Sequence, residues 1–224
     1  MISHDREKLI DVALDLCTRQ GYEATTIDQI AAAGGVTSHA VARYFATKDA
    51  IVMSIVDEIA VASAAELGQI PSQICPLEAL LAANTAVIAD ITNGAGVITR
   101  ERLHALAHIL TASPDVQKRA SARCKQVLSV ALAERMGVEP EDSRVRLAVT
   151  IRAAVIAAAC NFDRGRRAAV DPRNDGRVPE LMVERLNHVF THITGRAPAH
   201  LRSTVPITAK TTRGAGIHAV GSLL

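Results

Sequence analysis

Three threonines divide the first fifty residues of the chain into short helices, and this division limits the possible folds more than any other feature. Thr26 is followed three residues later by Gln29. At this spacing the threonine hydroxyl accepts from the Gln29 backbone N–H, and the glutamine side chain reaches back to the Thr26 N–H. A helix is therefore predicted to begin at Ile27. Thr37 and Thr47 are each placed to cap a further helix.

The segment before these caps is predicted to be a longer helix with one buried face. Between Asp5 and Gln20, apolar residues recur three and four positions apart, namely Leu9, Ile10, Ala13, Leu14, Leu16 and Cys17. Gly21 is placed to end this helix. After the second helix, Gly34 and Gly35 permit a tight turn, from which Val36 is expected to enter the core. These elements form one compact three-helix unit.

Two short helices joined by a glycine turn are typical of the helix-turn-helix, whose second helix enters the major groove of DNA. Here that helix is predicted to run from Thr37 to Tyr44. Its N-terminal dipole attracts phosphate, while Arg43 and Lys48 add charge and Tyr44 adds a phenolic donor. Residues 1–50 hold five Lys or Arg against seven Asp or Glu, so position rather than bulk charge must favour DNA. The alternative is that these residues are the polar side of a small bundle.

The order of several residue pairs is also informative. The pairs Gly-Tyr, Thr-Thr, Ile-Ala, Gly-Val and Tyr-Phe, and then a lysine, occupy positions 21–22, 25–26, 30–31, 35–36, 44–45 and 48. With Arg6 at the start of the first helix, this pattern resembles the signature of the tetracycline-repressor (TetR) family over about residues 6–58. The resemblance implies a DNA-binding transcriptional regulator, by default a repressor, with a helical sensor domain behind the helix-turn-helix.

The resemblance also implies roles for single residues. Residues matching positions that usually hold the DNA backbone are Thr26, Thr37, Tyr44 and Lys48, and those matching positions that face the groove are Ser38, His39 and Arg43. Where the family often has Gly-Thr-Leu-Tyr, this chain has residues 39–42 as His-Ala-Val-Ala, so a tyrosine that commonly contacts phosphate is replaced by Ala42. His39 can donate to guanine or, when charged, meet a phosphate. The alternative is a histidine exposed to solvent.

The rest of the chain is predicted to be helical because 49% of all residues are apolar and only 2% are aromatic. A core of Ala, Leu, Val and Ile packs well between helices. Further helices are expected over about residues 51–67, 77–92, 99–112, 114–136, 141–170 and 179–194. The predicted fold is all-α: a three-helix DNA-binding domain (1–50), a larger helical effector-binding and dimerisation domain (51–195) and a basic, flexible tail (196–224).

The sensor half is similar, in short stretches such as Arg102-Leu103 and residues 132–137, to the regulator of the mycofactocin system. That similarity implies a fatty acyl-thioester-like effector, whose phosphates would meet Arg164, Arg166 and Arg167; the alternative is that these arginines end a solvated helix. A small apolar effector needs an apolar pocket. The candidate lining residues are Leu103, Leu106, Leu110, Val127, Ile151 and Val155, the alternative being ordinary core.

The last two long helices are predicted to form a homodimer interface. Small residues on the first of them are Ala148, Ala153, Ala154, Ala157 and Ala158, and apolar residues on the second are Leu181, Leu186, Val189 and Ile193. Small side chains let helices of two subunits approach closely. A two-fold dimer presents its recognition helices about one DNA turn, ~34 Å, apart, so a palindromic operator in double-stranded DNA is expected.

Other functions find little support in the sequence. His104 and His108, like His188 and His192, stand four apart as zinc ligands can, but no nearby Glu or Cys completes a set. The four cysteines lack a C-x-x-C pair. No catalytic residue, cofactor or metal is therefore predicted, and the absence of a signal segment or membrane span predicts a cytoplasmic protein. The remaining rival is a nucleoid-type protein that binds DNA without sequence preference and without an effector.

Overall fold

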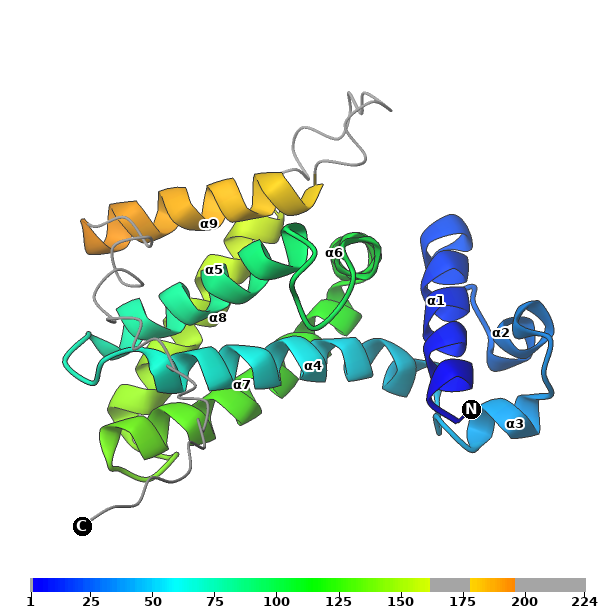
Figure 1. Cartoon of the computed structure of the whole chain (residues 1–224), viewed down its shortest axis with the longest axis horizontal. Coiled ribbons are helices and arrows are strands. Elements are labelled where there is room, and N and C mark those ends of the chain that lie inside the picture. Colours follow the sequence, from blue (N-terminus) through cyan, green and yellow to red (C-terminus); the bar gives the residue numbers. More distant parts are fainter. Residues whose placement is uncertain (1, 162–177, 196–224) are drawn as a thin grey trace, which may run out of the picture.

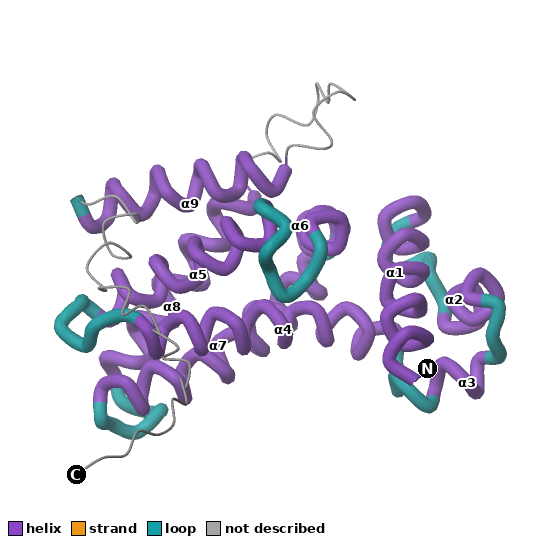
Figure 2. The backbone as a smooth tube through the Cα atoms, in the orientation of Figure 1, coloured by secondary structure: helices purple, strands orange, loops and turns teal. Residues whose placement is uncertain are grey.

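The computed structural model describes residues 2–161 and 178–195, and every regular element in these ranges is an α-helix (Figures 1 and 2). The helices are α1 (Ile2–Gln20), α2 (Ile27–Gly34), α3 (Ser38–Ala42), α4 (Lys48–Gln69), α5 (Pro76–Thr92), α6 (Arg100–Ala112), α7 (Pro114–Met136), α8 (Ser143–Asn161) and α9 (Val178–Thr194). This confirms the all-α prediction. The tail predicted for residues 196–224 lies outside the described residues, as do Arg164, Arg166 and Arg167.

Helices α1, α2 and α3 gather at one end of the molecule, and α4 leads away from them into the bundle formed by α5–α9 (Figure 1). The helix α4 begins at Lys48, so the predicted domain boundary between residues 50 and 51 falls inside its first turn. Near the N-terminus of α4, Ile51 and Ile55 are completely buried. They belong to one core that extends from α1 through α4 to α6 and α7. The two parts of the chain therefore share a continuous core along α4.

A second core closes the far end of the bundle, where Leu67 of α4 meets Leu80 of α5, Leu132 of α7 and Val149 of α8. Among the described residues, aliphatic and alanine side chains make up nearly all of the buried set, and the buried aromatic residues are Tyr22, Phe45 and Phe190. Small and branched aliphatic side chains fill the space between helices at high density without polar atoms. The aliphatic side chains that dominate the composition thus form the core between the helices.

The turn between α2 and α3 differs in one respect from expectation. Gly35 adopts a left-handed conformation with φ of 71°, and its N–H donates to the Ala31 and Ala32 carbonyls. The Val36 N–H donates to the Ala31 carbonyl at 2.9 Å, which completes a helix-ending motif that glycine accommodates without strain. The way α2 and α3 pack around this turn leaves Val36 39% exposed, so the prediction that it enters the core is wrong.

Two predicted helices also have different bounds. The helix predicted from Thr37 to Tyr44 is the shorter α3, with Thr37 as its N-cap and Arg43 as its C-cap. After Arg43, the Phe45 N–H still donates to the Val41 carbonyl at 2.9 Å, so the chain leaves α3 in a tight turn before Thr47 caps α4. The helix predicted over 141–170 begins at Ser143 and is described as far as Asn161, and the rest of the predicted range lies outside the described residues.

Candidate DNA-binding surface and effector cavity

Local hydrogen bonds fix the position of α3. The Thr26 hydroxyl accepts from the Gln29 N–H at 3.2 Å, and the Gln29 side chain accepts from the Thr26 N–H at 2.9 Å, so the predicted capping box is present. The Thr37 hydroxyl accepts from the Ala40 N–H at 3.2 Å. A hydroxyl that accepts in this way still has its own hydrogen to donate. Both threonines therefore stabilise helix starts and retain a donor for a phosphate.

One side of α3 is buried and the opposite side is open. Val41 is completely buried and Phe45 is 5% exposed, so these two side chains attach α3 to the core of the three-helix unit. His39 and Arg43 are exposed, and Tyr44 is half-buried. Two of the residues expected to face the groove are thus presented to solvent on a rigidly held helix.

The third of those residues, Ser38, is held by a neighbour. Its hydroxyl donates to the Asp28 carboxylate of α2, which ties the N-terminus of α3 to the preceding helix. Ala42, which replaces the tyrosine common in the family, is exposed. A methyl group at this position offers no hydrogen bond to a phosphate.

The structure gives Lys48 a role that sequence reasoning missed. Its Nζ donates to the Thr25 carbonyl at 2.8 Å, to the Glu23 carbonyl at 3.4 Å and also to the Tyr22 carbonyl. The same nitrogen lies 4.2 Å from the centre of the Tyr22 ring, within the range of a cation–π contact. An ammonium group has three donors, and here they face the carbonyls of the loop between α1 and α2. Lys48 thereby holds this loop in place.

Tyr22 continues this network toward the sensor domain. Its hydroxyl donates to the Asp49 carboxylate at 3.1 Å, and Arg119 of α7 donates to the same carboxylate at 2.9 Å. Burial, helped by the neighbouring Asp49 charge, raises the pKa of Tyr22 to about 12. The phenol therefore stays protonated at neutral pH and acts as a donor.

A second link joins α6 to α1 directly. Arg102 Nε donates to Asp11 Oδ1 at 2.6 Å, and the same guanidinium donates to the Glu7 carboxylate and, at 3.2 Å, to the Glu7 carbonyl. The hydrogen bond with Asp11, followed by that with Glu7, raises the pKa of Arg102 above its ordinary value although burial opposes the rise. Arg123 and Asp57 form a further ion pair between α7 and α4 at 2.6 Å. No sequence spacing pointed to these pairs.

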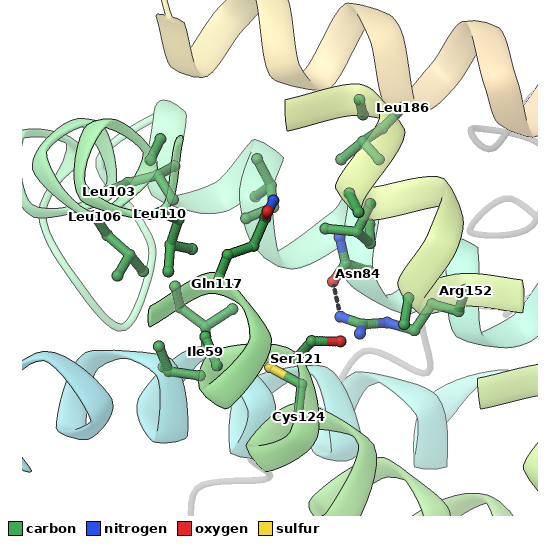
Figure 3. Close-up of a pocket in the computed structure, with 18 residues that line it drawn as sticks. Ile59, Asn84, Leu103, Leu106, Leu110, Gln117, Ser121, Cys124, Arg152 and Leu186 are labelled. Carbon is green, nitrogen blue, oxygen red and sulfur yellow. Dashed lines mark hydrogen bonds between the residues drawn. The ribbon is translucent and has the colours of Figure 1, made fainter. Parts of the chain in front are cut away.

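A cavity of about 120 Å³ lies in the helical bundle, and its lining residues come from α4 to α9. Its lining residues are Val56, Ile59, Asn84, Ile88, Leu103, Leu106, Ala107, Leu110, Gln117, Ala120, Ser121, Cys124, Arg152, Ala153, Ile156, Ala157, Ala159 and Leu186. Most are apolar. Figure 3 shows Gln117, Ser121 and Cys124 on α7 beside the cavity, and Asn84 hydrogen-bonded to Arg152.

The residues predicted to line a pocket divide into two groups. Leu103, Leu106 and Leu110 of α6 lie on the cavity wall. Ile151 and Val155 instead pack in a small core with Leu81, Ala82 and Phe190. Val127 is half-buried on α7, away from this wall. Because a helix turns 100° per residue, neighbouring apolar residues on α8 point in different directions and only some of them face the cavity. Apolar periodicity alone does not say which residues these are.

Two other features are absent from the part of the chain that the structure describes. That part holds no group of three or more His, Cys, Asp or Glu side chains arranged to bind a metal ion. His188 and His192 contact each other edge to face, with ring centroids 4.6 Å apart. No helix within the described ranges is both long and apolar enough to cross a membrane.

Known proteins share both the sequence pattern and the fold. A family model described as bacterial regulatory proteins, tetR family, matches residues 9–55. The HTH-type transcriptional regulator TcmR of Streptomyces glaucescens is 32% identical over 155 residues, which make up 67% of this chain and 69% of TcmR. These two matches concern the sequence and establish the family.

Solved structures with a similar fold include SmeT, the repressor of the Stenotrophomonas maltophilia multidrug efflux pump SmeDEF. SmeT has 20% sequence identity and a TM-score of 0.50, and the match covers 84% of this chain and 89% of SmeT. A SmeT–triclosan complex matches equally well, at 20% identity and a TM-score of 0.50 over 80% of this chain and 90% of that one. With its helix-turn-helix, the larger helical domain behind it and its similarity to TcmR, this chain belongs to the TetR family of bacterial transcriptional regulators.

Proposed function

We propose that the protein is a ligand-responsive repressor that acts in the cytoplasm, binds a palindromic operator as a homodimer and is released from it by a small, mainly apolar effector. The observation that carries this proposal is the double contact of α6. Three leucines of α6 line the cavity, and Arg102 on the same helix is paired with Glu7 and Asp11 of α1. A ligand that displaces α6 therefore acts on the helix that positions the DNA-binding module.

The proposed operator contacts are the residues that the family pattern implied. Thr26 and Thr37 are the N-caps of α2 and α3, where free helix N–H groups attract phosphate. Tyr44 follows the C-cap of α3 and offers a phenolic donor. His39 and Arg43 are exposed for base contacts, and Ser38 stands beside them. Lys48 supports the same surface from behind because it holds the loop that precedes α2.

The proposed dimer uses α8 and α9. Leu147 is 62% exposed, and Ala154 and Ala158 are exposed further along α8, seven and eleven positions later. These spacings place the three on one side of the helix. Ala153, Ala157 and Leu186, which the sequence assigned to the same interface, line the cavity instead and face their own protomer. Ala148 is buried in the second core. Leu181 and Ile193 have side chains outside the described residues.

The proposed effector is small because the cavity is. A cavity of about 120 Å³ is close in volume to one that holds a benzene molecule, roughly 150 Å³. SmeT, which has a similar fold, has been solved in complex with triclosan. The acyl chain of a short thioester also suits an apolar cavity of this kind, with its carrier group outside. The effector's chemical class is therefore the first property to test.

The test is a selection of genomic fragments by the purified protein, followed by gel shifts of the best site with and without candidate effectors. A specific regulator is expected to bind one palindromic site about 10³-fold or more tightly than random DNA, and one compound should release it. Equal binding to all fragments would favour the rival, a nucleoid-type protein that binds DNA without sequence preference. A specific site that no compound releases would remove the effector from the proposal.

A further inference from the structure

The helix α3 begins with a side chain that is already hydrogen-bonded to the helix before it. The Ser38 hydroxyl donates to Asp28 Oδ1 of α2, and Asp28 is exposed while Ser38 is half-buried. In a helix-turn-helix, the N-terminal residues of the second helix contact base edges in the major groove. Ser38 is the first residue of α3, so this pair lies where base contacts are expected.

The direction of this hydrogen bond decides what Ser38 can offer to DNA. A serine hydroxyl has one hydrogen to donate and two lone pairs that accept, whereas an ionised carboxylate only accepts. The shared hydrogen must therefore come from Ser38. Because that hydrogen is directed at Asp28, the serine oxygen has only lone pairs left for a third partner. The pair presents acceptors and no donor.

The charge of Asp28 sets a further condition. Asp28 takes part in none of the ion pairs found between described residues. Its hydrogen bond with Ser38 thus does not compete with an ion pair to a lysine or arginine in that part of the chain. The phosphates of DNA repel a carboxylate, so Asp28 weakens DNA binding unless a donor on the DNA compensates. A donor on a base is therefore the partner that this pair needs.

The bases differ in whether they offer such a donor. In the major groove, cytosine and adenine present an amino group, which donates, and we call them amino bases. Guanine and thymine present a carbonyl oxygen, which accepts, and we call them keto bases. An acceptor that faces another acceptor loses the hydrogen bond that it made in water. The Ser38 oxygen thus suits an amino base and opposes a keto base.

We propose that Ser38 selects an amino base, cytosine or adenine, at one position of each operator half-site, and that Asp28 is the positioning residue that fixes the direction of the Ser38 hydroxyl. This inference rests on the proposed operator binding and specifies the group on DNA that Ser38 binds. His39 and Arg43, whose side chains can donate, are expected to meet acceptors on other bases.

The test measures base preference on the operator that the genomic selection yields. Each position of one half-site is changed in turn to all four base pairs, and the full-length protein is titrated with each duplex at one salt concentration. At one position the wild type should bind an amino base about five- to tenfold more tightly than a keto base, which is the effect of roughly one hydrogen bond.

Two variants separate the contact from its positioning. In Ser38→Ala the preference should disappear because the acceptor is gone. In Asp28→Ala it should disappear because the freed hydroxyl can donate to a keto base. Asp15→Ala, which removes an exposed carboxylate from α1, is the control for charge and should leave the preference intact. Asp28 also lies in the first turn of α2, where a carboxylate stabilises the helix, but that role would not depend on the DNA sequence.

A chemical change in the DNA identifies the group that is bound. Replacing the preferred cytosine by 2-pyrimidinone, or the preferred adenine by purine, removes the amino group alone. The wild type should then lose about five- to tenfold in affinity, and Ser38→Ala should lose nothing further. Comparing the two proteins on the same duplexes cancels any effect of the analogue on the duplex itself, and thermal melting checks that each variant is folded.

Several outcomes would overturn the proposal. These are the lack of any position with a preference for amino bases, a response to the analogue that survives Ser38→Ala, or a wild-type preference in Asp28→Ala. All three leave the proposed function intact, because specific operator binding and its release by an effector are measured separately. If no DNA fragment is bound specifically, the proposed function itself fails, and this inference fails with it.

Discussion

The side chains proposed to bind DNA and those proposed to bind an effector lie in opposite environments. On α3 these side chains are exposed, and the buried residues Val41 and Phe45 only hold the helix. In the sensor domain they are buried, and residues such as Leu106 both support the fold and line the cavity. Function and stability are therefore separable in the first region and coupled in the second. Substitutions in the two regions should show this contrast.

The largest effect is expected from the double substitution of His39→Ala with Arg43→Ala. Each base contact contributes about 1–3 kcal/mol, and a dimer makes each contact twice, so binding to the preferred operator should weaken by several kcal/mol. The free energy of unfolding should change by less than ~0.5 kcal/mol because both side chains are exposed. Gel shifts on the operator and on random DNA, with chemical denaturation alongside, measure both quantities. An equal loss on every DNA sequence would contradict the groove assignment.

The substitution Leu106→Ala tests whether stability and ligand binding are coupled in the sensor domain. Leu106 is 4% exposed, and truncating a buried leucine lowers the free energy of unfolding by about 2–5 kcal/mol. Ligand binding should change as well, since the cavity becomes larger. Val61→Ala, at a position 59% exposed on α4, is the matched control and should have little effect on either quantity. Unchanged stability in Leu106→Ala would show that function and stability are separable here too.

Lys48→Met tests a half-buried residue that both stabilises the fold and supports the proposed DNA-binding surface. Loss of the hydrogen bonds to the loop carbonyls should lower the free energy of unfolding by about 1–3 kcal/mol. Binding to all DNA sequences should weaken together, whereas the slope of affinity against salt concentration should stay nearly the same. Lys118→Met, an exposed lysine on α7, is the control. A slope smaller by ~0.9 for each protomer would instead show that Lys48 contacts phosphate directly.

The last prediction concerns Arg102→Gln, which tests the link between the two regions. Partly exposed ion pairs contribute about 0.2–1 kcal/mol each, so the loss of stability should be modest. The ratio of operator affinities without and with effector should fall severalfold, because α6 is then less firmly attached to α1. Arg144→Gln removes an ion pair with Asp142 inside the sensor domain and should leave this ratio unchanged. Full release by effector in Arg102→Gln would mean that the link runs elsewhere.

The sequence predictions were accurate where the underlying interactions join residues close together in the sequence, and less accurate where they join distant residues. The starts of α2, α3 and α4 depend on threonines that bond three residues ahead, and all three caps are present. Val36 was wrongly predicted to be buried. The residue that follows the Gly34-Gly35 turn can be buried or exposed, and the packing of α2 against α3 decides which. Among the lining candidates, the α6 leucines reached the cavity, while Ile151 and Val155 joined a neighbouring core.

Helix positions, the glycine turn and the family signature were thus determined by the sequence alone, since caps, turns and apolar periodicity act between residues three or four apart. Tertiary structure decided the contacts that give those helices a function. Lys48 bonds across 23 residues to Thr25, Arg152 across 68 to Asn84 and Arg102 across 95 to Glu7. Whether two such distant side chains meet depends on how whole helices pack, because packing sets both their rotation and their separation.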